Sequence, residues 1–217
     1  MGHVPGRDVS WMYRKAVQLR GHTLKTKVRA SRGGRSGGDL WCNGGCRKTE
    51  SLMHILQECK LTQRLRIARH NRVMLKLEGS LRRAGLSVMR EPYIRKDKSY
   101  VKPDLLVSGT GKIYVLDVII CNDNRLLESW NSKIRKYNTN ELNDKFRQMC
   151  NVHKASVHHL PIALTMRGIM DGRSEKGLSE MGLPKTAISW LCEQTIVGSL
   201  ICYDAYMNDS LARTVRR

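Results

Sequence analysis

The sequence predicts an α/β fold in which helices pack around one mixed sheet, with a small metal-binding module in front of it. Two observations lead to this prediction. After residue 60, helical and strand-like patterns follow in the order helix, three strands, helix, strand, helix, which describes a mixed sheet covered by helices. A cluster of cysteine and histidine lies between residues 42 and 59, and 217 residues suffice for one ordinary domain plus a small module.

The first 39 residues predict a basic helix and a linker. Residues 10–29 (SWMYRKAVQLRGHTLKTKVR) can form the helix, and the glycine-rich run ASRGGRSGGD at 30–39 predicts a flexible joint. We therefore expect three regions. Residues 1–39 form this joining segment, 40–60 the metal-binding module, and 61–217 the main domain with a helical C-terminal tail.

The main domain begins with a helical pattern from Leu61 to about Ala84, in which His70, Met74, Leu77 and Leu81 recur at helical spacing. Strand-like runs follow at 86–94, 101–107 and 113–120, and a helix is predicted over 126–137. The run SVHHLPIALTM at 156–166 predicts another strand. Pro161 moves that strand toward a sheet edge or a bulge, because proline lacks the N–H that a central strand needs. Residues 184–207 predict a mainly helical tail.

The charge of the chain favours a polyanion as partner. Lysine and arginine number 39 against 19 acidic residues, a formal net charge of +20. Neutralising phosphates with such an excess releases counterions and steers association, so nucleic acid is the leading partner. A membrane is the weaker alternative, because no run approaches 18 apolar residues and no apolar signal segment follows the first methionine. The seven cysteines then fit a reducing compartment, where clustered cysteines indicate metal before disulfide.

The segment WCNGGCRKTESLMHILQEC places Cys42, Cys46, His54 and Cys59 as C-x3-C-x7-H-x4-C. A tetrahedral zinc site needs four such ligands, and a short glycine turn lets the first two thiolates converge. We expect the second pair to lie on a helix that begins near Thr49. The alternative is that His54 and Cys59 are ordinary helix residues.

Two aspartates interrupt apolar strands in VKPDLLVSGTGKIYVLDVIICNDN, residues 101–124. If SGTGK is a hairpin turn with Thr110 and Gly111 at its tip, paired residues sum to 221, and Asp104 lies opposite Asp117. Opposed residues on one sheet face have Cβ atoms about 5 Å apart. Two carboxylates that close are tolerated mainly with a proton or cation between them, and Mg²⁺ or Mn²⁺ fits. The alternative is that Asp104 caps a turn after Pro103 and Asp117 pairs with an arginine.

The same residues carry a family resemblance. KPDLL at 102–106 and DVII at 117–120, with 12 residues between the two aspartates, resemble the signature of PD-(D/E)xK restriction-like nucleases. Together with C-x3-C-x7-H-x4-C and ARHNRV, they resemble the carboxy-terminal endonuclease region of non-LTR retrotransposons that insert into ribosomal RNA genes. The resemblance covers about residues 40–140. It implies a CCHC zinc knuckle followed by a PD-(D/E)xK core, with Asp104 and Asp117 as catalytic, magnesium-binding residues.

One departure from the common motif concerns its lysine, because Ile119 occupies the position two residues after Asp117. In the retrotransposon group the lysine lies on the following helix, where Lys133 and Lys136 are the catalytic candidates. The apolar stripe of that helix comprises Leu126, Leu127, Trp130, Ile134 and Tyr137. Lys133 lies about 60° from its centre and Lys136 about 120°. Lys133 is therefore the better candidate to orient water or phosphate.

Other residues are candidates for a further acid or for nucleic-acid contact. Glu78 and Glu91 are possible acids, with neutralisation of arginines such as Arg82 or Arg90 as the alternative. Arg69, His70 and Asn71 match the RHN element of the family, although His70 could equally be a core histidine. The predicted nucleic-acid-binding residues are Lys60, Arg64, Arg66, Arg69, His70 and Asn71.

The resemblance implies a function in the nucleus. A single-strand break in a double-stranded chromosomal target, a ribosomal RNA gene, would provide the 3′ hydroxyl that primes reverse transcription of the element's RNA. The chain has no Tyr/Phe-x-Asp-Asp pattern, so a parent polyprotein would supply the polymerase and the contact with the element RNA. The alternative is a non-cleaving nucleic-acid-binding module with a nuclease-like fold.

Overall fold

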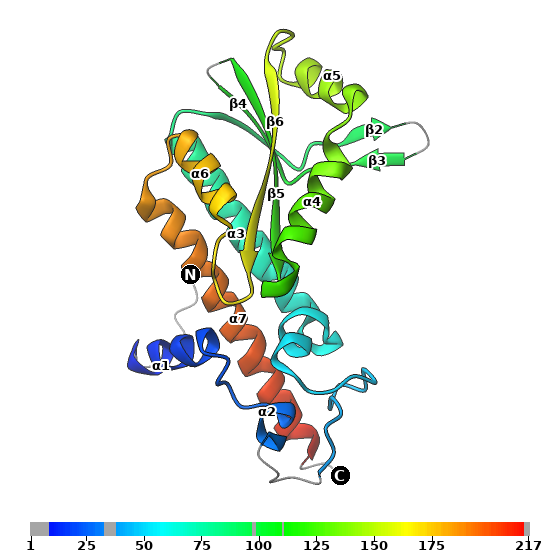
Figure 1. Ribbon diagram of the computed structural model, residues 1–217, viewed down its shortest axis with the longest axis vertical. Coiled ribbons are helices and arrows are strands. Elements are labelled where there is room, and N and C mark those ends of the chain that lie inside the picture. The colour runs from blue at the N-terminus through cyan, green and yellow to red at the C-terminus, as the bar shows by residue number, and fades with distance from the viewer. Residues whose placement is uncertain (1–8, 33–37, 97–98, 110, 215–217) are drawn as a thin grey trace. The chain divides into compact units, whose positions relative to one another are not determined.

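The computed structural model describes residues 9–32, 38–96, 99–109 and 111–214 (Figure 1). The chain forms two compact units. Unit 1 comprises Met1–Arg69 and Thr195–Arg217, and unit 2 comprises His70–Gln194. Two long helices, α3 (Gln63–Arg83) and α7 (Lys185–Thr214), each contribute residues to both units. Among the described residues, none of the helices combines the length and the apolar character that crossing a bilayer requires.

Unit 2 is built on a mixed four-stranded sheet, as the sequence predicts. The strands are β1 (Ser87–Arg90), β4 (Leu105–Gly109), β5 (Lys112–Cys121) and β6 (Ser156–Thr165), side by side in the order β1-β4-β5-β6. The β1–β4 and β4–β5 pairs are antiparallel, and β5 and β6 are parallel. The strand that contains Pro161 lies at the edge of the sheet, which confirms the expectation from proline chemistry.

Two predicted strands are divided in the structure. The runs at 86–94 and 101–107 each contribute to the main sheet and to a separate antiparallel hairpin, β2 (Ile94–Lys96) with β3 (Ser99–Val101). Pro92 and Pro103 lie at the two points of division. Because proline cannot donate to a strand ladder, both runs leave the main sheet there. Glu91 precedes the first break with a positive φ of 48°, which turns the chain away from β1.

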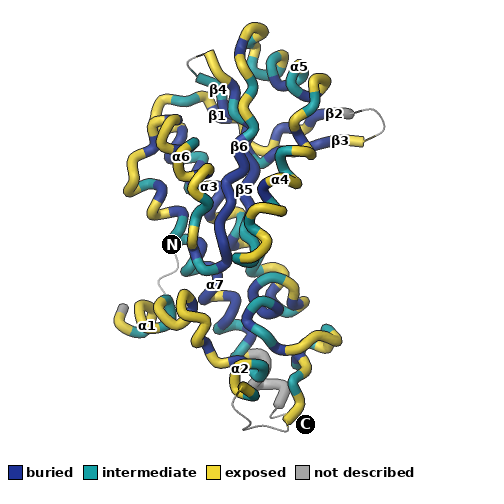
Figure 2. The backbone as a smooth tube through the Cα atoms, in the orientation of Figure 1, coloured by how far each residue is buried: buried dark blue, intermediate teal, exposed yellow. Residues whose placement is uncertain are grey.

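Side chains alternate between the two faces of the sheet, and two buried clusters pack against it, the first of which also includes Trp130 of α4. The first core joins the sheet to α3, α6 and α7 through residues such as Val73, Leu77, Leu116, Ile162, Leu178 and Leu191. The second core joins the opposite face to α4 and α5 through Leu106, Ile113, Val115, Tyr137, Leu142 and Phe146. Figure 2 shows long buried stretches in the paired strands β5 and β6 of unit 2. Burial on both faces explains the apolar sequence of β5.

The helices of unit 2 were predicted in part. The structure confirms α4 (Leu126–Tyr137) at both predicted ends, although Leu127 of its predicted apolar stripe is 61% exposed. Two short helices, α5 (Asn140–Met149) and α6 (Gly172–Glu180), were not predicted. Each is short and buries only two side chains, so few apolar positions indicate it in the sequence. The caps were the available signal, since Thr139 and Asp171 accept hydrogen bonds from the backbone N–H groups of Leu142 and Arg173.

Unit 1 corrects the prediction of one basic helix over residues 10–29. The helix α1 (Val9–Arg20) ends at Gly21 and His22, which has a φ of 55°, and α2 (Lys27–Ser31) begins after its N-cap Thr26. Glycine and a left-handed residue end a helix, so the two helices are separate. Part of the expected joint at 30–39, residues 33–37, lies outside the described residues. The helix expected from Thr49 is also shorter: η1 (His54–Glu58) and η2 (Lys60–Thr62) follow an isolated bridge between Trp41 and Thr49.

Candidate functional site

The cysteine and histidine cluster of unit 1 converges as its spacing predicts. One potential ligand atom from each of Cys42, Cys46, His54 and Cys59 lies within 4.8 Å of all the others. The Sγ atom of Cys59 is 3.7 Å from that of Cys42 and 3.8 Å from that of Cys46. Zn–S bonds of about 2.3 Å in a tetrahedron place sulfur atoms about 3.8 Å apart. The cluster therefore has the dimensions of a site that could hold zinc.

The imidazole of His54 provides an independent test of this fit. The side chain is buried, and both ring nitrogens lack a hydrogen-bond partner. Its Nδ1 lies 3.7 Å from Glu58 Oε2, beyond hydrogen-bond distance. Burial lowers the pKa of His54 below its usual value, which favours the neutral form that binds metal. A buried imidazole with two unsatisfied nitrogens beside three thiols fits a metal ligand.

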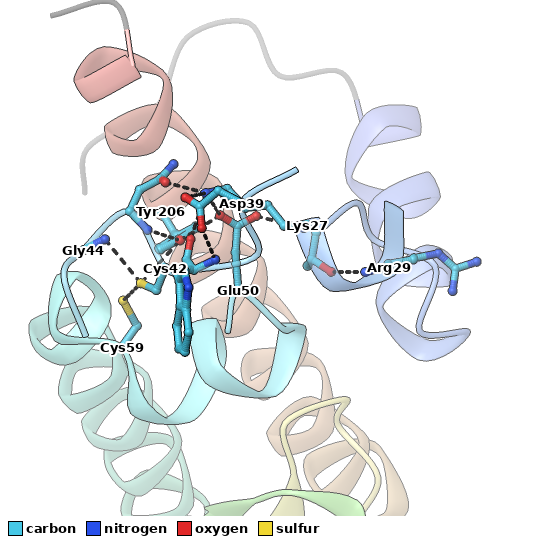
Figure 3. Close-up of polar contacts among 11 residues, drawn as sticks. Lys27, Arg29, Asp39, Cys42, Gly44, Glu50, Cys59 and Tyr206 are labelled. Carbon is cyan, nitrogen blue, oxygen red and sulfur yellow. Dashed lines mark hydrogen bonds and ion pairs between the residues drawn. The ribbon is translucent and has the colours of Figure 1, made fainter. Parts of the chain in front are cut away.

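The cluster is fixed by side chains that sequence reasoning missed (Figure 3). The Tyr206 hydroxyl of α7 lies 3.5 Å from Cys42 Sγ and 3.0 Å from Glu50 Oε2, and can donate its proton to either. Glu50 is 3% exposed, and its other oxygen accepts from the backbone N–H of Lys27 at 3.1 Å. The Lys27 ammonium in turn donates to the Trp41 carbonyl at 2.8 Å. Tyr206 lies far from the cysteines in sequence, so no spacing pattern could reveal it.

The thiols differ in how readily they ionise without metal. Burial opposes ionisation of Cys42, but hydrogen bonds from Tyr206 and from the Gly44 N–H outweigh it and lower its pKa. Burial raises the pKa of Cys59 to about 12. A bound cation would offset this penalty, because thiolates are the ligand form.

The predicted hairpin register is confirmed in unit 2. Gly109 pairs with Lys112 and Leu105 with Leu116, each pair summing to 221. The tip residue Thr110 lies outside the described residues. Asp104 immediately precedes β4, on the face that Leu106 and Val115 define, and the same register places it beside Asp117. The Oδ2 atom of Asp104 accepts from the Val118 N–H at 2.7 Å, which fixes it against the partner strand.

Two side chains of α4 hold the Asp117 carboxylate, which is only 5% exposed. Lys133 Nζ lies 2.5 Å from Oδ1, and the Tyr137 hydroxyl donates to Oδ2 at 2.6 Å. Burial, followed by the charge of Asp104, raises the pKa of Asp117 despite these partners. Asp117 is therefore a carboxylate whose ionised form gains from additional positive charge. The alternative that an arginine pairs with Asp117 is wrong, because the partner is a lysine.

The two candidate lysines are separated by the geometry that helical periodicity predicts. Lys133 points inward to Asp117, whereas the Lys136 ammonium lies 4.7 Å from the centroid of the Tyr137 ring. Tyr137 itself was considered only as part of the apolar stripe. Its position four residues after Lys133 was the available signal, since residues that far apart share a helix face.

His70 joins the site through Asp104. Its Nε2 lies 3.2 Å from Asp104 Oδ2 and 3.2 Å from the Val118 carbonyl oxygen, and Nδ1 lies 3.3 Å from Asn71 Oδ1. The hydrogen bond with Asp104 outweighs desolvation and raises the pKa of His70. The imidazole is partly buried beside the Asp104 carboxylate, and its other ring nitrogen lies next to the side chain of the exposed Asn71.

The structure corrects the prediction for Arg69. Its side chain is 3% exposed, and its guanidinium donates to Ser199 Oγ at 2.8 Å and to the Leu56 carbonyl at 3.1 Å. A buried group whose donors serve protein acceptors is not available to phosphate, so we assign Arg69 a structural role within unit 1. Lys60 and Arg64 are exposed as a phosphate contact requires. Arg66 is partly buried and donates to the carbonyls of Gln57 and Cys59.

The carboxylates of the two further acids are held in ion pairs with basic side chains. Glu78 pairs with Arg82 at 2.9 Å and with Arg90 at 3.4 Å, which confirms the alternative that it neutralises arginines. Glu91 pairs with Lys102 at 2.9 Å. Their side chains serve these contacts rather than adding a third carboxylate to Asp104 and Asp117.

Comparison with known proteins places the chain beside retrotransposon proteins. No family model matches it. It is 28% identical over 218 residues to the retrovirus-related Pol polyprotein from type-1 retrotransposable element R2 of Nasonia vitripennis, an alignment that covers 97% of this chain and 21% of the relative. Identity is 30% over 197 residues to the Pol polyprotein of type-2 element R2DM of Drosophila melanogaster, covering 90% and 18%. A Popillia japonica R2 Pol polyprotein is 32% identical over 204 residues, covering 93% and 41%. The chain thus spans about a fifth of the length of the first two relatives.

Proposed function

This chain is homologous over most of its length to the Pol polyproteins of R2 retrotransposable elements, and we propose that it is the part of such a polyprotein that cuts DNA. The proposed activity is that of a metal-dependent endonuclease. We propose a PD-(D/E)xK core for unit 2. The observation that carries the proposal is the pair of Asp104, which immediately precedes β4, and Asp117, which lies within the neighbouring strand β5, with the Lys133 ammonium on Asp117.

The donor set of this pair suits Mg²⁺ or Mn²⁺. Asp104 Oδ2 uses its lone pairs on the Val118 N–H and His70, but each oxygen of Asp117 has one described partner and so retains a lone pair. Oxygen ligands are those that hard divalent ions prefer. When bound by Asp104 and Asp117, the ion supplies activation of water and charge stabilisation at the scissile phosphate. Burial, followed by the charge of Asp104, raises the pKa of Asp117, so a bound cation would favour its ionised form.

The protein side chains have distinct roles in this proposal. Tyr137 and the Val118 N–H hold the two carboxylates in fixed orientations. Lys133, on α4 beside Asp117, orients the attacking water or the phosphate. His70 positions Asp104, and its imidazole, 32% exposed, also lies at the edge of the site where DNA could reach it.

We further propose that Cys42, Cys46, His54 and Cys59 bind a structural zinc ion, as a CCHC knuckle over residues 40–60. Residues 1–39 would join it to an upstream polymerase region, and residues 61–217 would form the endonuclease domain. The double-stranded target would be a ribosomal RNA gene in the nucleus. The nick would prime reverse transcription of the element RNA, which the parent polyprotein would bind.

The test is cleavage of a supercoiled plasmid and of a ribosomal-DNA duplex, with and without added Mg²⁺ or Mn²⁺. We expect Asp117→Ala and the near-isosteric Asp117→Asn to abolish nicking but retain gel-shift affinity, because neither removes a basic contact. Asp144→Ala is the matched control, since Asp144 is an exposed carboxylate paired with Arg147 at 2.7 Å. Undiminished nicking without metal by a folded Asp104→Ala, Asp117→Ala double variant would overturn the proposal. Protein that is inactive in isolation should be assayed within the parent polyprotein.

The second candidate function is a nucleic-acid-binding module without cleavage. The observation that favours it is that Lys133 and His70 already place cationic or polar groups on both carboxylates. The two functions differ in metal response. A binding module would show no metal-dependent nicking, also in the parent polyprotein.

A further inference from the structure

The β2–β3 hairpin of unit 2 divides its side chains between two faces. Ile94 and Val101 are paired in register and buried, at 3% and 9% exposure, in the core that α4 and α5 cover. Alternate residues of a strand point to opposite sides. The other face therefore carries, from the two arms, Tyr93, Arg95, Tyr100 and Lys102.

The two tyrosines stack on each other, and solvent can reach both side chains. Their ring centroids are 4.7 Å apart with planes inclined by 23°, a stacked arrangement. Tyr93 is nevertheless 64% exposed and Tyr100 59%. In some hairpins a cross-strand aromatic pair has no role beyond stabilising the hairpin. Here the hairpin is already anchored by its buried face and by Lys145, whose ammonium donates to the Arg95 carbonyl at 2.7 Å.

Two basic side chains share the face of the tyrosines. Arg95 is exposed, and Lys102 is 44% exposed and pairs with Glu91. Aromatic rings among cations are the combination with which proteins hold unpaired bases, since each base stacks on a ring while the cations attract phosphate. On a chain of net charge +20, this face suits a nucleic acid better than an apolar protein surface.

Both ends of the hairpin are attached to the candidate reaction centre. Before β2, the Glu91 N–H donates to the Asp104 carbonyl oxygen at 2.8 Å. After β3, the Lys102 carbonyl oxygen lies 3.2 Å from the Tyr137 hydroxyl, the same hydroxyl that donates to Asp117. Figure 1 shows the hairpin projecting beside α4. A base held on the tyrosines would therefore belong to DNA that passes the two aspartates.

We propose that the face formed by Tyr93, Arg95, Tyr100 and Lys102 is a stacking site for an unpaired base of the DNA next to the scissile phosphate. The site gives the endonuclease a preference for locally unpaired DNA. The inference rests on the proposed function, because the scissile phosphate beside the base is the one that the proposed endonuclease would cut. The stacking itself is independent of cleavage.

The experiment measures binding of the full 217-residue chain to two short DNA duplexes without added divalent ion, so that no cleavage is required. One duplex carries a single bulged 2-aminopurine, and the other is fully paired. Stacking on a ring should quench the fluorescence of the bulged base. We expect Tyr93→Ala, Tyr100→Ala to abolish the quenching and weaken binding of the bulged duplex by at least about fivefold, the lower end for one stacked base. Affinity for the paired duplex should be retained.

Two further variants separate stacking from hairpin stability. Tyr93→Phe, Tyr100→Phe keeps both rings and should behave as wild type. Tyr93→Leu, Tyr100→Leu keeps an apolar cross-strand contact but removes the flat rings, so it should lose quenching as the alanine variant does. Wild-type quenching and affinity in the leucine variant would overturn the proposal, as would equal losses on both duplexes. If the alanine variant lost more affinity for single-stranded RNA of the same sequence than for the bulged duplex, the proposal would also be overturned, in favour of an RNA site. Loss of nicking in Asp117→Ala tests only the proposed function and leaves this result unchanged.

Discussion

Lys133 and Lys136 are chemically identical and lie three residues apart on α4, yet only Lys133 reaches Asp117. We expect Lys133→Ala to reduce nicking by roughly 100-fold or more, comparable to the loss of one preorganised donor at a reacting oxygen. Lys136→Ala should reduce nicking far less, because its ammonium lies over the Tyr137 ring. The measurement is the initial nicking rate of each variant at saturating Mg²⁺.

Affinity for the uncleaved duplex is the control for the two lysine variants, because each loses one positive charge. Equal affinities with unequal rates would locate the Lys133 effect in the reaction. Equal rates for the two variants would remove Lys133 from the proposed mechanism.

The zinc ligands lead to a second prediction at the scale of single residues. Purified protein should contain about one zinc ion per chain, and Cys46→Ser, Cys59→Ser should lose it, because two ligands cannot retain a structural site. Metal analysis of both proteins provides the measurement. Cys192→Ser is the matched control, since Cys192 lies against the core of unit 2. Full zinc occupancy in the double variant would contradict the ligand assignment.

At the scale of elements, the segments of α3 and α7 in unit 1 approach each other at Gly198. A Cβ atom added there would lie 2.4 Å from Arg69 Cγ and 2.9 Å from Arg69 Cβ, well inside contact distance. Arg69 cannot move aside freely, because its guanidinium is held by Ser199 and the Leu56 carbonyl. The glycine is thus required by close packing of the two helices.

We expect Gly198→Ala to lower the free energy of unfolding by about 1–3 kcal/mol through overpacking. Gly79→Ala is the matched control in α3, where an added Cβ would meet only the end of the Arg83 side chain at 3.5 Å. That change should stabilise the protein by about 0.5–1 kcal/mol, because alanine has the higher helix propensity. Urea denaturation measures both. Stabilisation by both substitutions would show that the helices can separate at Gly198 without loss.

At the scale of the whole molecule, the net charge of +20 governs association with DNA. The logarithm of affinity should fall steeply against the logarithm of salt concentration, as release of several counterions requires. Lys60→Ala or Arg64→Ala should each reduce the magnitude of the slope by about one, because both side chains are exposed. Arg69→Lys should leave the slope unchanged, since that position is buried. A flat plot for the unaltered protein would limit the charge excess to a role in solubility.

Much of the fold could be predicted from sequence where the signal is local. Periodicity gave both ends of α4, and turn chemistry gave the register of β4 and β5, because each depends on residues only a few positions apart. The short helices α5 and α6 were missed, since each has only two buried side chains to indicate it. The strands around Pro92 and Pro103 were predicted as continuous, although proline was the signal for their division.

For the candidate sites, the sequence by itself determined which residues come together when their spacing lies within one turn, one hairpin or one helix. The four residues of the cysteine and histidine cluster, the opposed aspartates and the inward lysine are of this kind. Only the tertiary structure decided the contacts between distant segments. These contacts are those of the buried Arg69 with Ser199 of α7, of Tyr206 with Cys42, and of His70 with Asp104. The exposure of the tyrosines of the β2–β3 hairpin likewise depends on the tertiary structure. The physical reason is that burial depends on how elements pack, and helical and strand periodicity specify only which side of an element a residue occupies.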